Sequence, residues 1–174
     1  MHILHICGDY PYQSIYRQLL LHLAGAGSLT QTMYVPLPRN SAPDAPSDAP
    51  VNSVRLIYSH DYAGVERMLY HRRMGRIRAG IARQVDLGTV QLVHAHFLFT
   101  AGGAAYALHQ AAGLSYIVTV RNTDLNVYFR FAVHLRRFGL KVLEAASAIQ
   151  FPSPAYRERL LSRYVPQELR AAFE

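Results

Sequence analysis

Short apolar segments alternate along the chain with longer segments in which apolar residues recur at helical spacing. Residues 2–7 are apolar at nearly every position, as expected of a parallel strand that is buried on both faces. Residues 13–24 carry leucines and aromatic residues at helical spacing, and Gly25 and Gly27 end that segment. The same criteria predict further strands at 30–35, 54–58, 92–97, 115–120 and 148–151, and further helices at 62–84, 102–112, 126–145 and from 154 onward.

This regular alternation predicts one α/β domain over residues 1–174: Rossmann-like, with three α/β/α layers and a mainly parallel sheet. Two stretches depart from the pattern. Residues 36–53 are rich in Pro, Ser, Asp and Ala and predict a long exposed loop. The helix at 62–84 contains Gly75 and Gly80, and we expect an interruption near one of them.

The first candidate loop, Gly8-Asp9-Tyr10, follows the first strand at the edge where ligands of parallel sheets bind. A dinucleotide fingerprint is missing, because the loop has one glycine and residues 34–37 offer no carboxylate for a ribose. Gly8 still allows close approach to an anionic group. We therefore expect Gly8, Asp9 and Tyr10 to bind substrate, with a plain tight turn as the alternative.

The second candidate loop contains His94 and His96, which lie two residues apart and therefore face the same side of a strand. Together with Asp124 they would make a three-ligand metal site. The alternative is that one histidine lines a substrate pocket and the other is a hydrogen-bonded core residue. We favour the second interpretation and expect no metal or other cofactor. Since the sequence does not say which histidine lines the pocket, His94 and His96 are both candidate substrate-binding residues.

The third candidate loop, residues 121–124, is the most polar segment that directly follows a buried strand. Arg121 can hold a phosphate or carboxylate with two hydrogen bonds, and Asn122, Thr123 and Asp124 can bind sugar hydroxyls. The alternative is a helix cap made by Thr123 or Asp124. Capping leaves Arg121 unexplained, since a cation is unfavourable beside a helix N-terminus.

Composition and charge narrow the class of protein. Hydrophobic residues make up 51% and charged residues 17% of the chain, which favours a globular fold over disorder. No apolar run is long enough to span a bilayer, residues 1–7 lack the features of a signal peptide, and Cys7 is the only cysteine. These features predict a cytoplasmic protein.

The net charge of +7 is uneven, because sixteen of the eighteen Lys and Arg residues follow residue 53. The densest stretch contains six arginines and no acidic residue. It favours contact with an anionic membrane at the inner face of the plasma membrane, and a solvated helical face is the alternative. Its arginines are Arg67, Arg72, Arg73, Arg76, Arg78 and Arg83.

Taken in order, the segments 92–97, 116–124 and 148–153 resemble the N-terminal domain of family 4 glycosyltransferases. Members of that family show a strand ending in His-x-His, a Thr-x-His-Gly-x-Asp stretch, and a strand ending in Ser before a helix. The resemblance covers nearly the whole chain. Asp124 matches the family aspartate, whereas Arg121 and Asn122 replace the family's histidine and glycine, and Gly8 stands where the family has a glycine pair.

The resemblance implies one half of a GT-B enzyme, in which two Rossmann-like domains face each other across a cleft. The N-terminal half would bind a sugar or lipid-linked acceptor, and a C-terminal half with a Glu-x7-Glu motif would bind the nucleotide-sugar. Transfer in the family needs no metal. On this basis Asp124 and Arg121 are the candidate catalytic residues, the C-terminal domain is absent from the 174 residues, and the fragment alone is expected to be inactive.

Two other classes of function remain as alternatives. The first is a metal-dependent hydrolase that uses His94, His96 and Asp124, although the chain is short for the barrels that usually carry such sites. The second is a nucleic-acid-binding module that uses the arginines. Since the sequence has no recognisable nucleic-acid-binding motif, we expect no nucleic-acid partner.

Overall fold

The computed structural model describes residues 1–41, 51–67 and 69–173. Six strands form one sheet in the order β3-β2-β1-β4-β5-β6, and every neighbouring pair is parallel. The strands are β1 (His2–Ile6), β2 (Thr30–Pro38), β3 (Val54–Tyr62), β4 (Leu92–Ala95), β5 (Tyr116–Thr119) and β6 (Ala148–Gln150).

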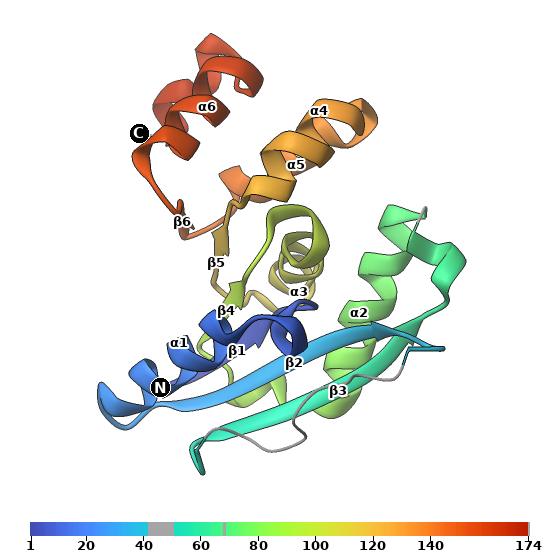
Figure 1. Ribbon diagram of the computed structural model, residues 1–174, viewed down its shortest axis with the longest axis vertical. Helices are drawn as coiled ribbons and strands as arrows, with labels where there is room; N and C mark the ends of the chain where they lie inside the picture. Colours follow the sequence, from blue (N-terminus) through green and yellow to red (C-terminus); the bar gives the residue numbers. More distant parts are fainter. Residues whose placement is uncertain (42–50, 68, 174) are drawn as a thin grey trace.

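Helices cover both faces of the sheet (Figure 1). The α-helices are α1 (Ser14–Gly25), α2 (Tyr70–Gln84), α3 (Gly103–Ala112), α4 (Phe129–Phe131), α5 (Arg136–Glu144) and α6 (Pro154–Tyr164). Two π-helical turns lie at Leu98–Gly102 and Asp124–Tyr128, and short 3-10 turns lie at Tyr10–Tyr12, Gly64–Arg67, Leu87–Thr89, Val133–Leu135 and Gln167–Phe173.

Two hydrophobic cores, one on each face of the sheet, give the predicted three-layer α/β/α Rossmann-like architecture. Alternate side chains of β1 enter different cores: Leu4 and Ile6 pack in the larger core with residues of α2, α3 and α5, whereas Cys7, just beyond the strand, packs in the smaller core with Tyr16 and Leu20 of α1. Burial on both faces explains why these strands are nearly continuous apolar runs.

Several element bounds differ from those predicted. The strand β2 continues to Pro38, so the first three residues of the loop predicted at 36–53 are strand, and residues 42–50 lie outside the described residues. The strand β3 continues to Tyr62 and α2 begins at Tyr70, so the helix predicted at 62–84 begins later than expected. The long helix predicted at 126–145 is broken at Ala132, whose backbone leaves the helical region. Arg136 Nε donates to the Phe129 carbonyl, which the break frees from its helical partner.

The predicted interruption of α2 was wrong, because the helix runs unbroken from Tyr70 to Gln84. Gly80 is instead a point of close packing. A Cβ atom added there would overlap the carboxylate of Asp61 and the hydroxyl of Tyr34. Asp61 is buried and accepts hydrogen bonds from Tyr34 (2.7 Å) and Ser59 (2.8 Å).

Substituting the two glycines of α2 tests this packing. Gly80→Ala is expected to lower the free energy of unfolding by about 3 kcal/mol, because it adds overpacking and breaks buried hydrogen bonds. Gly75→Ala is the matched control, since nothing lies within 4 Å of an added Cβ; it is expected to raise stability by about 0.5–1 kcal/mol. Urea unfolding measures both, and equal effects of the two substitutions would contradict the packing.

Candidate functional site

The strand order places β1 and β4 side by side at the centre of the sheet. Their helices leave in opposite directions, because α1 packs on one face and α3 on the other. Such a switch point opens a crevice at the carboxyl ends of the strands, where ligands bind in open α/β folds. All three loops singled out from the sequence lie at this edge, after β1, β4 and β5.

A cavity of about 350 Å³ lies at this edge, on the side of β1, β2 and β3. That volume is within the range of small-molecule sites. Backbone at Gly8 and side chains from several elements line it, among them Asp9, Tyr12, Arg73 and Thr100. The predicted substrate-binding residues Gly8 and Asp9 therefore do face a cavity.

The first loop presents Asp9 and Tyr12, whereas Tyr10 points the other way. Tyr10 is 7% exposed and packs in the smaller core, so its expected place in the pocket is taken by Tyr12. Asp9 is half-buried. Burial raises the pKa of its carboxyl, and the charge of Arg121 opposes that rise.

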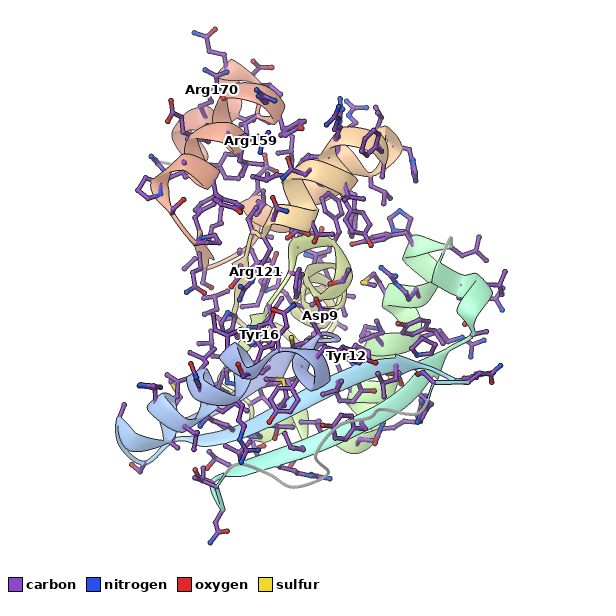
Figure 2. All side chains as sticks on the ribbon, viewed as in Figure 1. Asp9, Tyr12, Tyr16, Arg121, Arg159 and Arg170 are labelled. Atoms are coloured by element: carbon purple, nitrogen blue, oxygen red, sulfur yellow. The ribbon has the colours of Figure 1, made fainter. Side chains whose placement is uncertain are left out.

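The guanidinium of Arg121 reaches from the end of β5 across to the first loop. Its Cζ atom lies 5.3 Å from the centre of the Tyr16 ring and 5.6 Å from that of Phe97, and its Nε donates to the His96 carbonyl at 3.4 Å. Figure 2 shows Arg121 and Tyr16 near Asp9, at the centre of the molecule. A cation is therefore held at the switch point, as the sequence predicted.

Asp124 is fully buried, and its carboxylate binds backbone groups. Oδ2 accepts from the N–H groups of Leu98 (3.1 Å) and Arg121 (2.8 Å), and Oδ1 accepts from that of Phe99 (3.0 Å). Burial raises the pKa of this carboxyl to about 6, against the effect of the three donors. Asp124 thus ties the loop after β4 to the loop after β5, and it includes the capping role that the sequence left open.

Asn122 and Thr123 are exposed at the start of the helical segment after β5. The Asn122 side-chain oxygen accepts a hydrogen bond from the Asn126 amide. Thr123 makes no capping hydrogen bond with its side chain. Neither residue lines the cavity beside Asp9, so their predicted contacts with sugar hydroxyls remain predictions.

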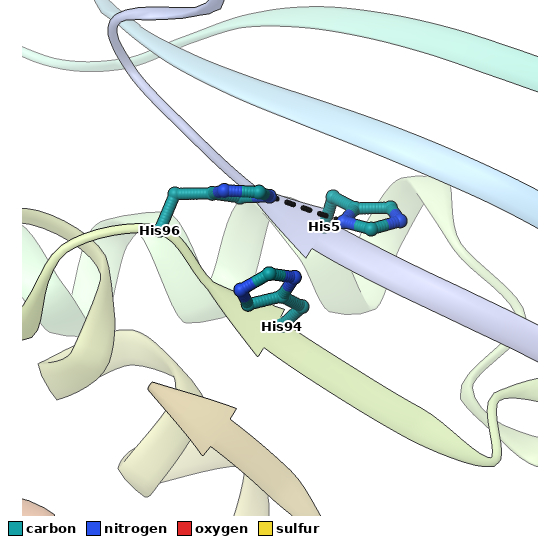
Figure 3. Close-up of side chains that lie close together, drawn as sticks. All are labelled: His5, His94 and His96. Atoms are coloured by element: carbon teal, nitrogen blue, oxygen red, sulfur yellow. Dashed lines mark hydrogen bonds between the residues drawn. The ribbon is translucent and has the colours of Figure 1, made fainter. Parts of the chain in front are cut away.

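His94 and His96 are joined by a third histidine, His5 of β1 (Figure 3). His5 Nδ1 lies 3.1 Å from His96 Nε2, and His94 Nε2 lies 3.0 Å from the Thr119 hydroxyl. Because that hydroxyl gives its one proton to Gln150 (2.8 Å), the proton between Thr119 and His94 comes from the imidazole.

All three histidines are neutral at pH 7. Burial lowers the pKa of His5 to about 3 and that of His94 to about 4, and it holds the pKa of His96 well below its usual value. The positive charge of Arg121 acts in the same direction on His94 and His96.

Neutral imidazoles are the form that binds metal ions, and one ligand atom from each histidine lies within 4.8 Å of the others. The group nevertheless differs from the metal site considered from the sequence, because His5 occupies the place that was given to Asp124. No carboxylate belongs to this group, and Arg121 would repel a cation from His94 and His96.

The predicted arginine stripe is divided between three environments. Arg72 and Arg76 are exposed on α2 and contact the buried Glu66 through their Nε atoms, at 2.8 and 3.6 Å. Arg73 is 7% exposed. Its assignment to a surface patch was therefore wrong, because helical periodicity turns it inward together with Met74 and Ile77.

The predicted membrane contact involves the remaining arginines of the stripe as well, and it stays a prediction. Arg83 is exposed and Arg78 is partly exposed on α2, while the side chain of Arg67 lies outside the described residues. Within the part of the chain that the structure describes, no helix is long and apolar enough to cross a membrane.

Two residues of this region, His5 and Tyr12, were missed by the sequence interpretation, and a third, Arg73, was wrongly assigned to the surface. The first could have been found, because His5 pairs with His94 in the register of β1 and β4. Adjacency of these strands is the usual order in doubly wound sheets. Arg73 lies three residues after the buried Tyr70 and four before the buried Ile77, a spacing that places it on the inner face of α2.

Known proteins share both the sequence pattern and the fold. The glycosyl transferase 4-like domain family matches residues 14–172. A protein of Bacillus subtilis named as the teichuronic acid biosynthesis glycosyltransferase TuaC is 38% identical over 58 residues, which cover 33% of this chain and 15% of the relative.

Two structures of sucrose-phosphate synthase from Thermosynechococcus elongatus each match 96% of this chain, with TM-scores of 0.65 and 0.68 and identities of 19% and 18%. The chain covers 84% of the first structure and 46% of the second. At this identity the two structures support the fold alone, whereas membership of the family follows from the sequence match. Since that match spans nearly all of its length, the chain belongs to the glycosyl transferase 4-like family.

Proposed function

We propose that this chain is the acceptor-side domain of a glycosyltransferase, which transfers a sugar from a nucleotide-sugar to a glycan or lipid-linked acceptor. The observation that carries the proposal is the family match over residues 14–172. The cavity lined by Asp9, whose carboxyl feels the charge of Arg121, supports the place where the acceptor would bind. The names of the relatives refer to teichuronic acid and to sucrose-phosphate.

A second, donor-binding domain completes the proposed enzyme. The cavity opens at the carboxyl edge of the sheet, and a domain docked over that edge would close the nucleotide-sugar against Gly8 and Arg121. Reaction then requires the acceptor hydroxyl to lose a proton while a nucleoside diphosphate leaves. In this proposal Asp9 faces the acceptor, and Arg121 stabilises negative charge on the phosphate groups.

Arg121 has a double role in this account, because its guanidinium carries the charge and packs between Tyr16 and Phe97. In the full-length enzyme, Arg121→Ala is expected to lower kcat/KM by about 10- to 100-fold, the value of one or two charge-assisted hydrogen bonds. Arg121→Lys is expected to retain more activity than the alanine variant, since the charge remains.

The control for Arg121 is Arg137→Ala, which removes an exposed arginine of α5. Steady-state kinetics with varied acceptor and varied donor measure the three variants. An unchanged kcat/KM for Arg121→Ala would remove Arg121 from the mechanism. An equal loss in Arg137→Ala would show that the assay responds to overall charge.

A further inference from the structure

Arg73 is buried, and two of the three nitrogen atoms of its guanidinium have no hydrogen-bond partner among the described residues. The side chain projects from α2, and both Nε and Nη2 are inaccessible to solvent and make no hydrogen bond with the described residues. The Cζ atom lies 5.9 Å from the ring centres of Tyr62 and Tyr70. Aromatic faces attract a cation, but they do not satisfy its N–H donors.

The neighbouring acid is already engaged elsewhere. Glu66 lies just before α2, and its Oε1 contacts Arg72 and Arg76. Its Oε2 accepts the backbone N–H of Ala63 at 2.8 Å. Among the arginines of α2, all of which the structure describes, Arg73 is therefore the one that neither contacts Glu66 nor projects into solvent.

An unpaired buried cation is costly. Charged groups inside proteins are almost always paired, and leaving one unpaired costs several kcal/mol. Native proteins retain such unfavourable groups mainly at functional sites. Arg73 lines the cavity beside Gly8 and Asp9, so a ligand in that cavity can supply the missing partner.

The chemistry and the place of Arg73 define the group it would bind. A planar guanidinium pairs best with a carboxylate or phosphate, which accept two parallel N–H donors. Arg73 lies over Tyr62 at the end of β3, whereas Asp9 follows β1, two strands away. Both side chains line the same cavity, so a sugar that carries one anionic group can contact Arg73 and Asp9 together.

We propose that Arg73 is a specificity-determining residue that binds the anionic group, a phosphate or a carboxylate, of the acceptor sugar. The inference rests on the proposed function, because it assigns the cavity to the acceptor. It adds that the acceptor is charged, and that its uncharged end lies toward Asp9, where the first loop approaches the switch point.

Calorimetric titration of this chain with three probes tests the inference. Glucose 6-phosphate and glucuronate distinguish phosphate from carboxylate, and glucose is the neutral reference. At least one anionic probe is expected to bind ten-fold or more tightly than glucose. Arg73→Met, which keeps the length of the side chain, is expected to abolish that preference, and Arg73→Lys to retain part of it.

Arg159→Met is the matched control, because Arg159 is an exposed arginine of α6, far from Asp9 and Tyr12 in Figure 2. It is expected to keep the preference for the anionic probe. Thermal unfolding without ligand gives a second readout: the Tm of Arg73→Met is expected to be unchanged or raised, since the substitution removes an unpaired charge. A Tm lowered by several degrees would indicate a structural arginine and contradict the proposal.

Besides a lowered Tm, two binding results would overturn the inference. In the first, glucose binds as tightly as both anionic probes; the acceptor is then neutral, and the proposed glycosyltransferase function is unaffected. In the second, the anionic preference survives in Arg73→Met, so another cation binds the ligand. Failure of the proposed function itself is distinguished by a separate measurement, the absence of sugar transfer by the full-length enzyme.

Discussion

Asp124→Ala is expected to destabilise the domain by about 3–5 kcal/mol. The substitution leaves three buried N–H groups, those of Leu98, Phe99 and Arg121, without their acceptor, and each buried unsatisfied group costs about 1–3 kcal/mol. Since these groups belong to the loops after β4 and β5, the site loses its order together with the stability. Urea unfolding of the variant measures the loss.

Two control variants are compared with Asp124→Ala. Asp124→Asn keeps one acceptor oxygen and is expected to lose less stability than Asp124→Ala. Asp86→Ala removes an exposed carboxylate that accepts one backbone N–H, from Gly88 at 3.0 Å, and is expected to cost about 1 kcal/mol. If Asp124→Ala unfolds at the wild-type urea concentration and only its sugar transfer is lost, Asp124 is a catalytic residue and its positioning role is refuted.

Acid is expected to unfold the domain through its three buried histidines. The unfolded chain protonates each histidine below about pH 6.5, whereas folding lowers the pKa of His5 to about 3 and that of His94 to about 4. The unfolded state therefore binds more protons, and stability falls as the pH decreases. Each histidine contributes roughly 1.4 kcal/mol per pH unit.

Asp124 opposes part of this loss. Its pKa is raised to about 6 in the folded state, so the folded protein takes up one proton as the pH falls toward 4. Burial also raises the pKa of Asp9 and Asp61, and these groups act in the same direction as Asp124. The slope between pH 6 and 4 is therefore smaller than the three histidines alone would give. His94→Gln is expected to reduce the slope by about one proton, and His134→Gln, at an exposed position, to leave it unchanged. Stability that does not change between pH 7 and 5 would contradict the buried neutral cluster.

The fold could be predicted from the sequence because its strands are buried on both faces. Because of that burial, β1, β4 and β5 are short apolar runs. The helical periodicity between them is then sufficient to predict a three-layer fold with a parallel sheet. The break at Ala132 could not be predicted, because residues 126–138 contain no glycine or proline that would mark it. Gly80 was misjudged because its neighbour Asp61 comes from another element.

The candidate site was predicted in its location and less well in its chemistry. The loops after three strands could be assigned to one edge, because carboxyl ends of parallel strands meet there. Which side chains face the cavity depends on the local turn. Because of that turn Tyr12 lines the cavity, whereas Tyr10, which was predicted to do so, is buried in the core. Arg73 was not distinguished from the neighbouring arginines in the sequence. The spacing of the buried residues of α2 nevertheless indicates that its side chain faces inward.

The central claim is that the chain serves sugar transfer, and the most direct measurement is incorporation of label from radioactive nucleotide-sugars by the full-length protein purified from the cells that produce it. Lipid-linked and phosphorylated sugars serve as acceptors, with and without EDTA. Label is expected in a new glycosidic bond, insensitive to EDTA and reduced in Arg121→Ala. Absence of transfer with every donor, accompanied by a hydrolysis that EDTA abolishes, would contradict it.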